Sequence, residues 1–426
     1  MTALAVTARS PVTINRRLLA AGALTAFGLV DMLIFGLFSH PGDATFALAL
    51  TGASIKVPSI HVPGGPLAYI LGGASVLIGI ARLAVTESAV FRRLGIAAVL
   101  LFFVISLLAW SDTGSWAHGI PVNVVSLLQG TLAGSIPLIL GALAGCMGER
   151  AGVINIAIEG QLLLGAFMAA IVASAVGVVW IGLISGSLAG GLVGLILALF
   201  AMRYLVDQII LGVVLNLLIS GLTGYLYDRL LVPDATTYNN ASTFSPIKIP
   251  GLGDIPILGP ILFDSTIFLY ITYAAIILVQ VGLFRTRWGL RVRAVGEHPT
   301  AADTVGIKVR GIRYGNLIMG GMLAGIGGAY LTVGSVGTFS KDMSSGLGYI
   351  ALAAMIFGRW TPLGGTVAAL LFGFTTALGS FLGSITVPIS PFLLNMAPYV
   401  ATIIAVAGLV GRVRAPAADG KPYVRA

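Results

Sequence analysis

Long apolar runs separated by short polar connectors dominate the hydrophobic pattern of this chain. Many runs approach the roughly 20 residues that a helix needs to cross a bilayer. Others are shorter or interrupted by glycine and proline, which is typical of broken or re-entrant membrane helices. The apolar segments lie near residues 18–38, 66–81, 94–110, 126–147, 153–176, 179–201, 208–228, 266–284, 314–333, 346–359, 363–383 and 397–411. The pattern predicts an all-α polytopic membrane protein with about 12 transmembrane helices, some of them broken or re-entrant.

Composition and charge support this class and set an orientation. Of the 426 residues, 57% are hydrophobic and only 9% are charged, and the mean hydropathy is +1.01. Lipid is therefore the expected main solvent. With both termini in the cytoplasm, 20 of the 24 Lys and Arg residues fall on the cytoplasmic side. The exceptions are Lys56, Arg229, Lys248 and Lys341. This asymmetry follows the positive-inside rule and explains the net charge of +9 without any nucleic acid.

Two connectors are long enough to have functions of their own. Residues 229–265 form an outside loop, and residues 285–313 form an inside loop with seven basic residues. In the inside loop, Gly296–Pro299 predicts a turn and Thr300–Asp303 the start of a short helix. From its charge alone, the inside loop could equally be an anchor that fixes topology. The glycine spacing in Met319–Gly334 predicts close helix packing.

Several chemistries have no basis in the sequence. No G-x-x-x-x-G-K-[ST] motif occurs, so the chain is not expected to be an enzyme, and any ATP must be hydrolysed by another subunit. Cys146 is the single cysteine, and no HExxH motif suggests a metal site. Asp228 and Asp254 imitate the aspartates of an intramembrane protease, but Asp254 lies among prolines and Asp228 at a segment end.

One apolar segment contains polar residues that should be costly in lipid. If residues 148–159 are helical, Gly148, Gly152, Asn155 and Glu159 share one face. Intramembrane ionisable residues usually face a bundle interior or an aqueous path, so Asn155 and Glu159 are candidates for a substrate pathway. The alternative is that Glu159 only holds helices together. A similar choice applies to Asn216, the lone amide of its apolar segment, which could simply bridge two helices.

Four motifs together carry a family resemblance. They are ERAGVINIAIEGQLLLGAF (149–167), DQIILGVVLNLLISGLTGYL (207–226), TRWGLRVRAVGEHPTAADTVGIKV (286–309) and FSKDMSSGLGYIALAAMIFGRWTPLGG (339–365). In this order they resemble the permease subunits of bacterial nucleoside ABC importers, within the broader branched-chain amino acid and simple-sugar permease family. The resemblance implies a permease core over residues 121–411 and a cytoplasmic tail over 412–426. Residues 1–120, with about three transmembrane helices, form an N-terminal extension without a recognised counterpart.

The resemblance also implies partners and a location. They are a sister permease, usually in a heterodimer, a separate ABC ATPase that uses ATP, an extracytoplasmic substrate-binding lipoprotein, and the lipid of a bacterial cell membrane. The chain itself is expected to bind no cofactor. The inside loop would couple to the ATPase through Arg291, Arg293, Gly296, Glu297, His298, Pro299, Asp303 and Gly306. Arg291 and Arg293 would position this segment, while Glu297 and Asp303 would contact the ATPase or cap the coupling helix.

A nucleoside is neutral and rich in hydrogen-bonding groups, so amides and a carboxylate suit it. The expected pathway residues are Asn155, Glu159, Gln161 and Asn216. The alternatives are a simple sugar or a branched-chain amino acid on the same architecture, or an ion-coupled secondary transporter that needs no ATPase.

Overall fold

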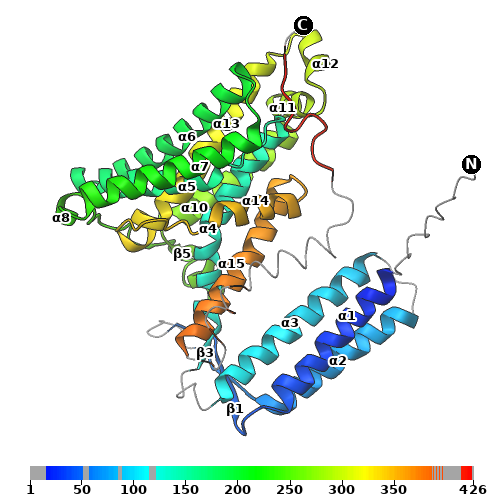
Figure 1. The fold of residues 1–426 in the computed structure, drawn as a ribbon. Helices are drawn as coiled ribbons and strands as arrows, with labels where there is room; N and C mark the ends of the chain where they lie inside the picture. Colours follow the sequence, from blue (N-terminus) through cyan, green and yellow to red (C-terminus); the bar gives the residue numbers. More distant parts are fainter. Residues whose placement is uncertain are drawn as a thin grey trace, which may run out of the picture. The chain divides into compact units, whose positions relative to one another are not determined.

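The computed structural model describes residues 16–50, 57–84, 89–114, 121–385, 387, 390, 393, 396 and 414–424. Most of these residues are helical (Figure 1). The chain divides into two compact units. One consists of Met1–Val124 with Leu382–Ile389, and the other of Val125–Phe381 with Ser390–Ala426.

The N-terminal unit contains three apolar helices and a small sheet. The elements are α1 (Arg16–Val30), which continues as a π-helical turn (Asp31–Gly36), β1 (Asp43–Ala47), β2 (Ile60–Pro63), α2 (Gly64–Ala84), α3 (Ala89–Thr113) and β3 (Val122–Asn123). Strand β1 pairs antiparallel with β2 and parallel with β3. Helices α1 and α2 pack so closely at Gly28 that an added Cβ would lie 2.6 Å from the Gly72 carbonyl oxygen. Small residues thus let these two helices meet backbone to backbone.

The second unit holds the longer series of apolar helices. Its elements are α4 (Val124–Arg150), α5 (Ile158–Val176), α6 (Val179–Arg203), α7 (Gln208–Leu226) with a π-helical turn (Tyr227–Leu231), α8 (Ala235–Tyr238), β4 (Ile247–Lys248), α9 (Leu258–Phe263), β5 (Asp264–Ser265), α10 (Ile267–Arg285), α11 (Arg287–Glu297), α12 (Pro299–Thr304), α13 (Val309–Leu331) with a π-helical turn (Thr332–Val336), α14 (Leu347–Phe357) and α15 (Pro362–Ser384). Strands β4 and β5 pair as a short antiparallel ladder between α8 and α10.

Helices α5, α6 and α13 form the centre of this unit, side by side in Figure 1. Their contact consists largely of backbone. A Cβ added at Gly190 of α6 would clash with the carbonyl oxygen of Gly321 in α13, and one at Gly325 with that of Gly186. The close packing predicted from the glycine spacing is therefore confirmed.

The predicted fold class is also confirmed. The described residues contain nine helices long and apolar enough to cross a membrane, and two shorter apolar helices, Ala20–Gly36 and Leu347–Phe357. These eleven helices correspond to all the predicted segments except 397–411, which lies outside the described residues. Helix α14 has only 11 residues, as expected of a half-helix.

One predicted helix start is wrong. The segment 153–176 becomes helical only at Ile158, because α4 ends at Arg150 and Gly152 adopts a left-handed backbone with φ of +82°. A Cβ at Gly152 would also lie 2.9 Å from the Arg313 guanidinium. The shared helical face of Gly148, Gly152, Asn155 and Glu159 therefore does not exist. Instead, Ala151–Ala157 connects the two helices and brings Asn155 close to the start of α5.

Candidate functional site

The carboxylate of Glu159 lies at the amino end of the half-helix α14. It accepts hydrogen bonds from Ser344 Oγ at 2.6 Å, from the Gly346 amide at 2.8 Å and from the Gly348 amide at 2.7 Å. The first amides of a helix have no partner within the helix, and its amino end carries partial positive charge. Glu159, in the first turn of α5, therefore accepts hydrogen bonds from otherwise unpaired amides of α14 and places its carboxylate at the positive end of that helix.

Asn216 of α7 ties the same region together from a second side. Its side-chain oxygen accepts from the Gly160 amide at 2.8 Å, and its nitrogen donates to the Ile156 carbonyl at 2.9 Å and to the Tyr349 hydroxyl at 3.1 Å. Tyr349 belongs to α14. Asn216 thus links α7, the segment before α5 and the half-helix through one amide.

Asn155 and Gln161 pair with each other beside this network. Their side-chain amides exchange two hydrogen bonds, at 3.2 and 3.3 Å, and both residues are completely buried. A closed amide pair satisfies polar groups that would otherwise be costly in an apolar interior. The pair holds the non-helical segment against the first turns of α5.

The four predicted pathway residues therefore lie close together around the start of α5. Their polar groups are engaged by other parts of the chain in this conformation, and a role in substrate passage stays a prediction. Sequence reasoning missed the partners Ser344, Gly346 and Tyr349. The available signal was the Ser-Ser-Gly-Leu-Gly-Tyr run directly before an apolar segment too short to cross a membrane.

The two aspartates that imitate a protease lie in separate places, Asp228 in the π-helical turn after α7 and Asp254 in the segment between β4 and α9. Asp228 forms an ion pair with Lys341 at 2.7 Å, and Asp254 forms one with Lys248 at 2.5 Å. All four side chains are about half exposed, and the pairing lowers the pKa of Asp254. Each aspartate thus has a lysine of its own and a half-exposed side chain, unlike two catalytic aspartates that share a proton.

The inside loop folds into two helices, α11 and α12. The Thr286 hydroxyl accepts from the Gly289 amide at 3.1 Å and starts α11, while Pro299 occupies the first turn of α12. The short helix predicted at Thr300 is present and starts one residue earlier. The predicted turn is narrower than expected, since Gly296 and Glu297 still belong to α11 and His298 alone separates the helices.

The predicted coupling residues divide into an inner and an outer set. Gly296 is buried, and the Arg293 guanidinium stacks on the Phe284 ring at 5.3 Å. The outer set comprises Arg291, Glu297, His298 and Gly306, which are exposed, together with the half-buried Pro299 and Asp303. Gly306 has a φ of +85°, which favours glycine at the end of α12. Asp303 lies in the last turn of α12, so it does not cap the start of that helix.

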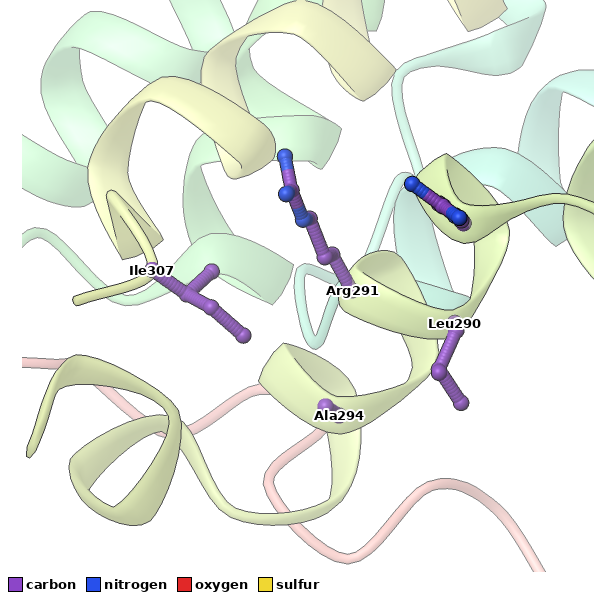
Figure 2. Close-up of a pocket in the computed structure, with 5 residues that line it drawn as sticks. Leu290, Arg291, Ala294 and Ile307 are labelled. Atoms are coloured by element: carbon purple, nitrogen blue, oxygen red, sulfur yellow. The ribbon is translucent and has the colours of Figure 1, made fainter. Parts of the chain in front are cut away.

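The exposed side of α11 has a mixed apolar and basic character. Arg287, Leu290, Arg291, Ala294 and Ile307 line a depression of about 480 Å³. In Figure 2, Leu290, Arg291 and Ala294 project from α11, and Ile307 comes from the segment after α12. Leu290 is 61% exposed and Val305 74% exposed. Apolar side chains surrounded by charge are typical of a surface that binds another protein.

Comparison with known proteins adds independent information. The model of the family described as "Branched-chain amino acid transport system / permease component" matches residues 127–410. The guanosine ABC transporter permease protein NupQ of Bacillus subtilis is 40% identical over 71% of this chain and 98% of its own length. The nucleoside ABC transporter permease protein NupC of Lactococcus lactis is 38% identical over 71% of this chain and 99% of its own length.

A sugar permease also matches, at lower identity. The "Putative glucose ABC transporter permease protein TsgC13" of Haloferax volcanii is 34% identical over 62% of this chain and 80% of its own length. No solved structure matches the chain.

Proposed function

Because this chain belongs to the branched-chain amino acid transport system / permease component family, we propose that it is the membrane-spanning permease subunit of an ATP-driven nucleoside importer. The observation that carries the proposal is the 40% identity to a guanosine permease along 98% of that protein. The sugar-permease relative TsgC13 is less similar, at 34% identity, and aligns over a smaller part of its length, 80%. The alternative of a sugar substrate is therefore less well supported than a nucleoside.

The surroundings of α14 support a neutral substrate over an amino acid. In transporters with broken helices, the amino end of a half-helix commonly binds an anionic group of the substrate. At α14 this position is already taken by the carboxylate of Glu159. An amino acid would bring a second carboxylate to the same place, where two like charges repel. A nucleoside has no carboxylate and can exchange hydrogen bonds with Asn155, Gln161 and Asn216 as the network opens.

The α11–α12 segment is proposed as the coupling element that docks to the ATPase. Its exposed apolar residues Leu290 and Val305 would enter a groove of that subunit, while Arg287 and Arg291 would face acidic groups at the rim. ATP-driven closure of the ATPases would then pull on this segment and reorient the membrane helices. This chain binds no cofactor in the proposal, and ATP is used by the partner.

The remaining partners are proposed on the same basis. A sister permease would complete the pathway as a heterodimer, and a substrate-binding lipoprotein would dock on outer segments near 229–265 and 334–345. An ion-coupled secondary transporter would need none of these partners. The proposal places the complex in a bacterial cell membrane.

Uptake in a strain lacking its other nucleoside transporters tests the proposal directly. Cells with and without this gene receive labelled uridine or adenosine, competed by unlabelled nucleosides, ribose or leucine. We expect the gene to restore uptake, competition by nucleosides alone, and loss of uptake when the ATPase gene is deleted. Competition by ribose or leucine would reassign the substrate, and uptake without the ATPase would indicate a secondary transporter.

The coupling role needs its own test. Scrambling Gly296–Gly306 should abolish uptake while the protein still accumulates in the membrane. Uptake that survives this change would refute the coupling role of α11 and α12.

A further inference from the structure

The C-terminal tail, Arg414–Val424, is packed against the proposed coupling helices. The Ala418 amide donates to the Gly296 carbonyl at 2.9 Å, and the Ala417 amide donates to the Glu297 carboxylate at 3.2 Å. Both acceptors lie in the last turn of α11. The tail therefore binds the segment that the proposed function assigns to coupling.

The apolar part of the tail adds a second contact. Tyr423 is 8% exposed and packs in one cluster with Val295 of α11, Ala302 of α12 and Val309 of α13. The remaining tail residues around it, Lys421, Pro422 and Val424, are exposed. A single buried aromatic side chain thus joins the three helices that meet at the coupling segment.

Asp419 connects the tail to α4. It forms a side-chain hydrogen bond with Glu149, the residue before Arg150, where α4 ends. The Glu149 carboxyl also accepts from the Trp360 indole nitrogen. Trp360 lies in the turn between α14 and α15, where Arg359 and Trp360 both have left-handed φ values of 55° and 54°. A residue other than glycine in this conformation requires support from its surroundings.

Arg150 supplies that support from the end of α4. Its guanidinium donates to the Trp360 carbonyl at 2.8 Å and to the Arg359 carbonyl at 3.3 Å. The carboxyl-terminal end of α4 therefore binds the turn after α14 through Arg150 and the tail through Glu149.

Arg313 of α13 binds both the tail and the segment after α4. Its side chain is 1% exposed and donates to the Ala151 carbonyl at 3.2 Å and to the Lys421 carbonyl of the tail at 3.0 Å. A buried guanidinium with backbone acceptors is costly to move, because its charge would lose these partners within an apolar interior. Arg313 thus fixes the tail to the segment between α4 and α5.

We propose that the C-terminal tail is a transmission element, which joins the coupling helices α11–α12 to the half-helix α14 through Asp419, Glu149 and Trp360. The inference rests on the proposed coupling function. Movement of α11 would shift the tail through the Gly296 and Glu297 contacts, and the tail would pass the shift to the turn after α14. The opposite end of α14 is the one that Glu159 and Asn216 hold. Asp419, Glu149 and Arg313 are positioning residues, since none of them need touch the substrate or ATP.

The test compares three variants in the complete importer, reconstituted in liposomes with its sister permease, ATPase and binding protein. In Asp419→Ala the tail loses its bond to Glu149. In Asp419→Asn the side chain keeps a hydrogen-bonding group at the same position, next to the Glu149 carboxyl. In the control, Lys421→Ala, only an exposed side chain is removed, since the tail uses the Lys421 carbonyl. The readout is labelled uridine imported per ATP hydrolysed, a ratio that does not depend on how much complex assembles.

We expect Asp419→Ala to lower this ratio by about tenfold, the effect of losing a buried hydrogen-bond partner worth about 1.4 kcal/mol. For Asp419→Asn and Lys421→Ala, the uridine imported per ATP hydrolysed should stay within about twofold of the value for the unchanged protein. A tenfold change would correspond to about 1.4 kcal/mol. A merely structural role would lower transport and ATP hydrolysis together and leave the ratio unchanged. An unchanged ratio in Asp419→Ala would overturn the inference.

The scrambled Gly296–Gly306 variant separates the two claims. If scrambling abolishes uptake while Asp419→Ala keeps a normal ratio, the coupling function stands and the transmission role of the tail is wrong. If uptake survives scrambling, the proposed coupling function itself fails.

Discussion

Replacing Glu159 by alanine should disconnect α14 from α5. The substitution removes the acceptor of three hydrogen bonds, two of them from backbone amides at the amino end of the half-helix. Leaving a buried donor without a partner costs about 1–3 kcal/mol, and loss of the favourable charge at a helix end adds about 0.3–1 kcal/mol. Three unpaired donors and the lost charge together should therefore cost the docking of α14 roughly 3–6 kcal/mol. The value lies in the lower part of the summed ranges because the donors can partly move toward other acceptors.

The control is an acidic cap of the same kind in an exposed position. Asp207 starts α7 and accepts from the Ile209 and Ile210 amides at 2.9 and 3.0 Å. Because water can replace an exposed cap, Asp207→Ala should cost only about 1 kcal/mol. Glu159→Gln keeps one acceptor oxygen and loses the charge, so its effect should lie between the two alanine variants.

Two measurements check the comparison. Uridine uptake is normalised to the amount of protein in the membrane, and the melting temperature of the purified complex is followed in detergent. Since each 1.4 kcal/mol is a factor of ten, a loss of 3 kcal/mol should reduce the docked state of α14 by roughly 100-fold. Equal uptake and equal melting temperatures for Glu159→Ala and Asp207→Ala would refute the capping role of Glu159.

Two further predictions concern packing and pH. Gly190→Ala should destabilise the helix bundle by about 1–3 kcal/mol or more, because its methyl group would clash with the Gly321 carbonyl. Gly221→Ala, where nothing lies within 4 Å of the added methyl, should be tolerated, and thermal unfolding of the two variants checks this. Burial raises the pKa of Asp419 from 3.8 to about 6, although Glu149 and Arg313 face it. Because this carboxyl pKa is raised, docking of the tail is most stable below pH 4 and loses that stability as pH rises through 6. Exchange of the tail amides, divided by their intrinsic exchange rate at each pH, should therefore be slower at pH 5 than at pH 7. Asp419→Asn should remove this dependence, and the same dependence in the variant would assign it to another group.

The membrane class and most helices could be predicted from the sequence because both follow from local hydrophobicity. The polar residues of the site were found for a related reason, since Glu159 and Asn216 stand out in apolar surroundings. Their partners could not be found this way. Ser344 is 185 residues from Glu159, and nothing in a local pattern indicates which of several serines a carboxylate will contact.

The wrong helix start has a similar cause. Gly152 could have continued a helix as far as its neighbours in sequence are concerned. Its backbone is left-handed, and an added Cβ would lie 2.9 Å from the Arg313 guanidinium and 3.2 Å from the Ala418 carbonyl oxygen, both far along the chain. The tail sequence Ala-Pro-Ala-Ala-Asp-Gly-Lys-Pro likewise resembles an ordinary cytoplasmic end, and only the folded structure shows that it is docked.

The glycine contacts among α5, α6 and α13 limit how this protein can move. Where two helices meet through side chains, rotamer changes allow sliding in small steps. Where they meet backbone to backbone, as at Gly190 and Gly321, there are no side-chain rotamers to adjust, and the rigid backbones themselves fix the position of one helix against the other. These three helices should therefore move as one rigid body during the transport cycle. The hinges of the movement must then lie at the edges of this rigid body. The hydrogen bonds that hold α14 against α5 can break and re-form without separating α5, α6 and α13.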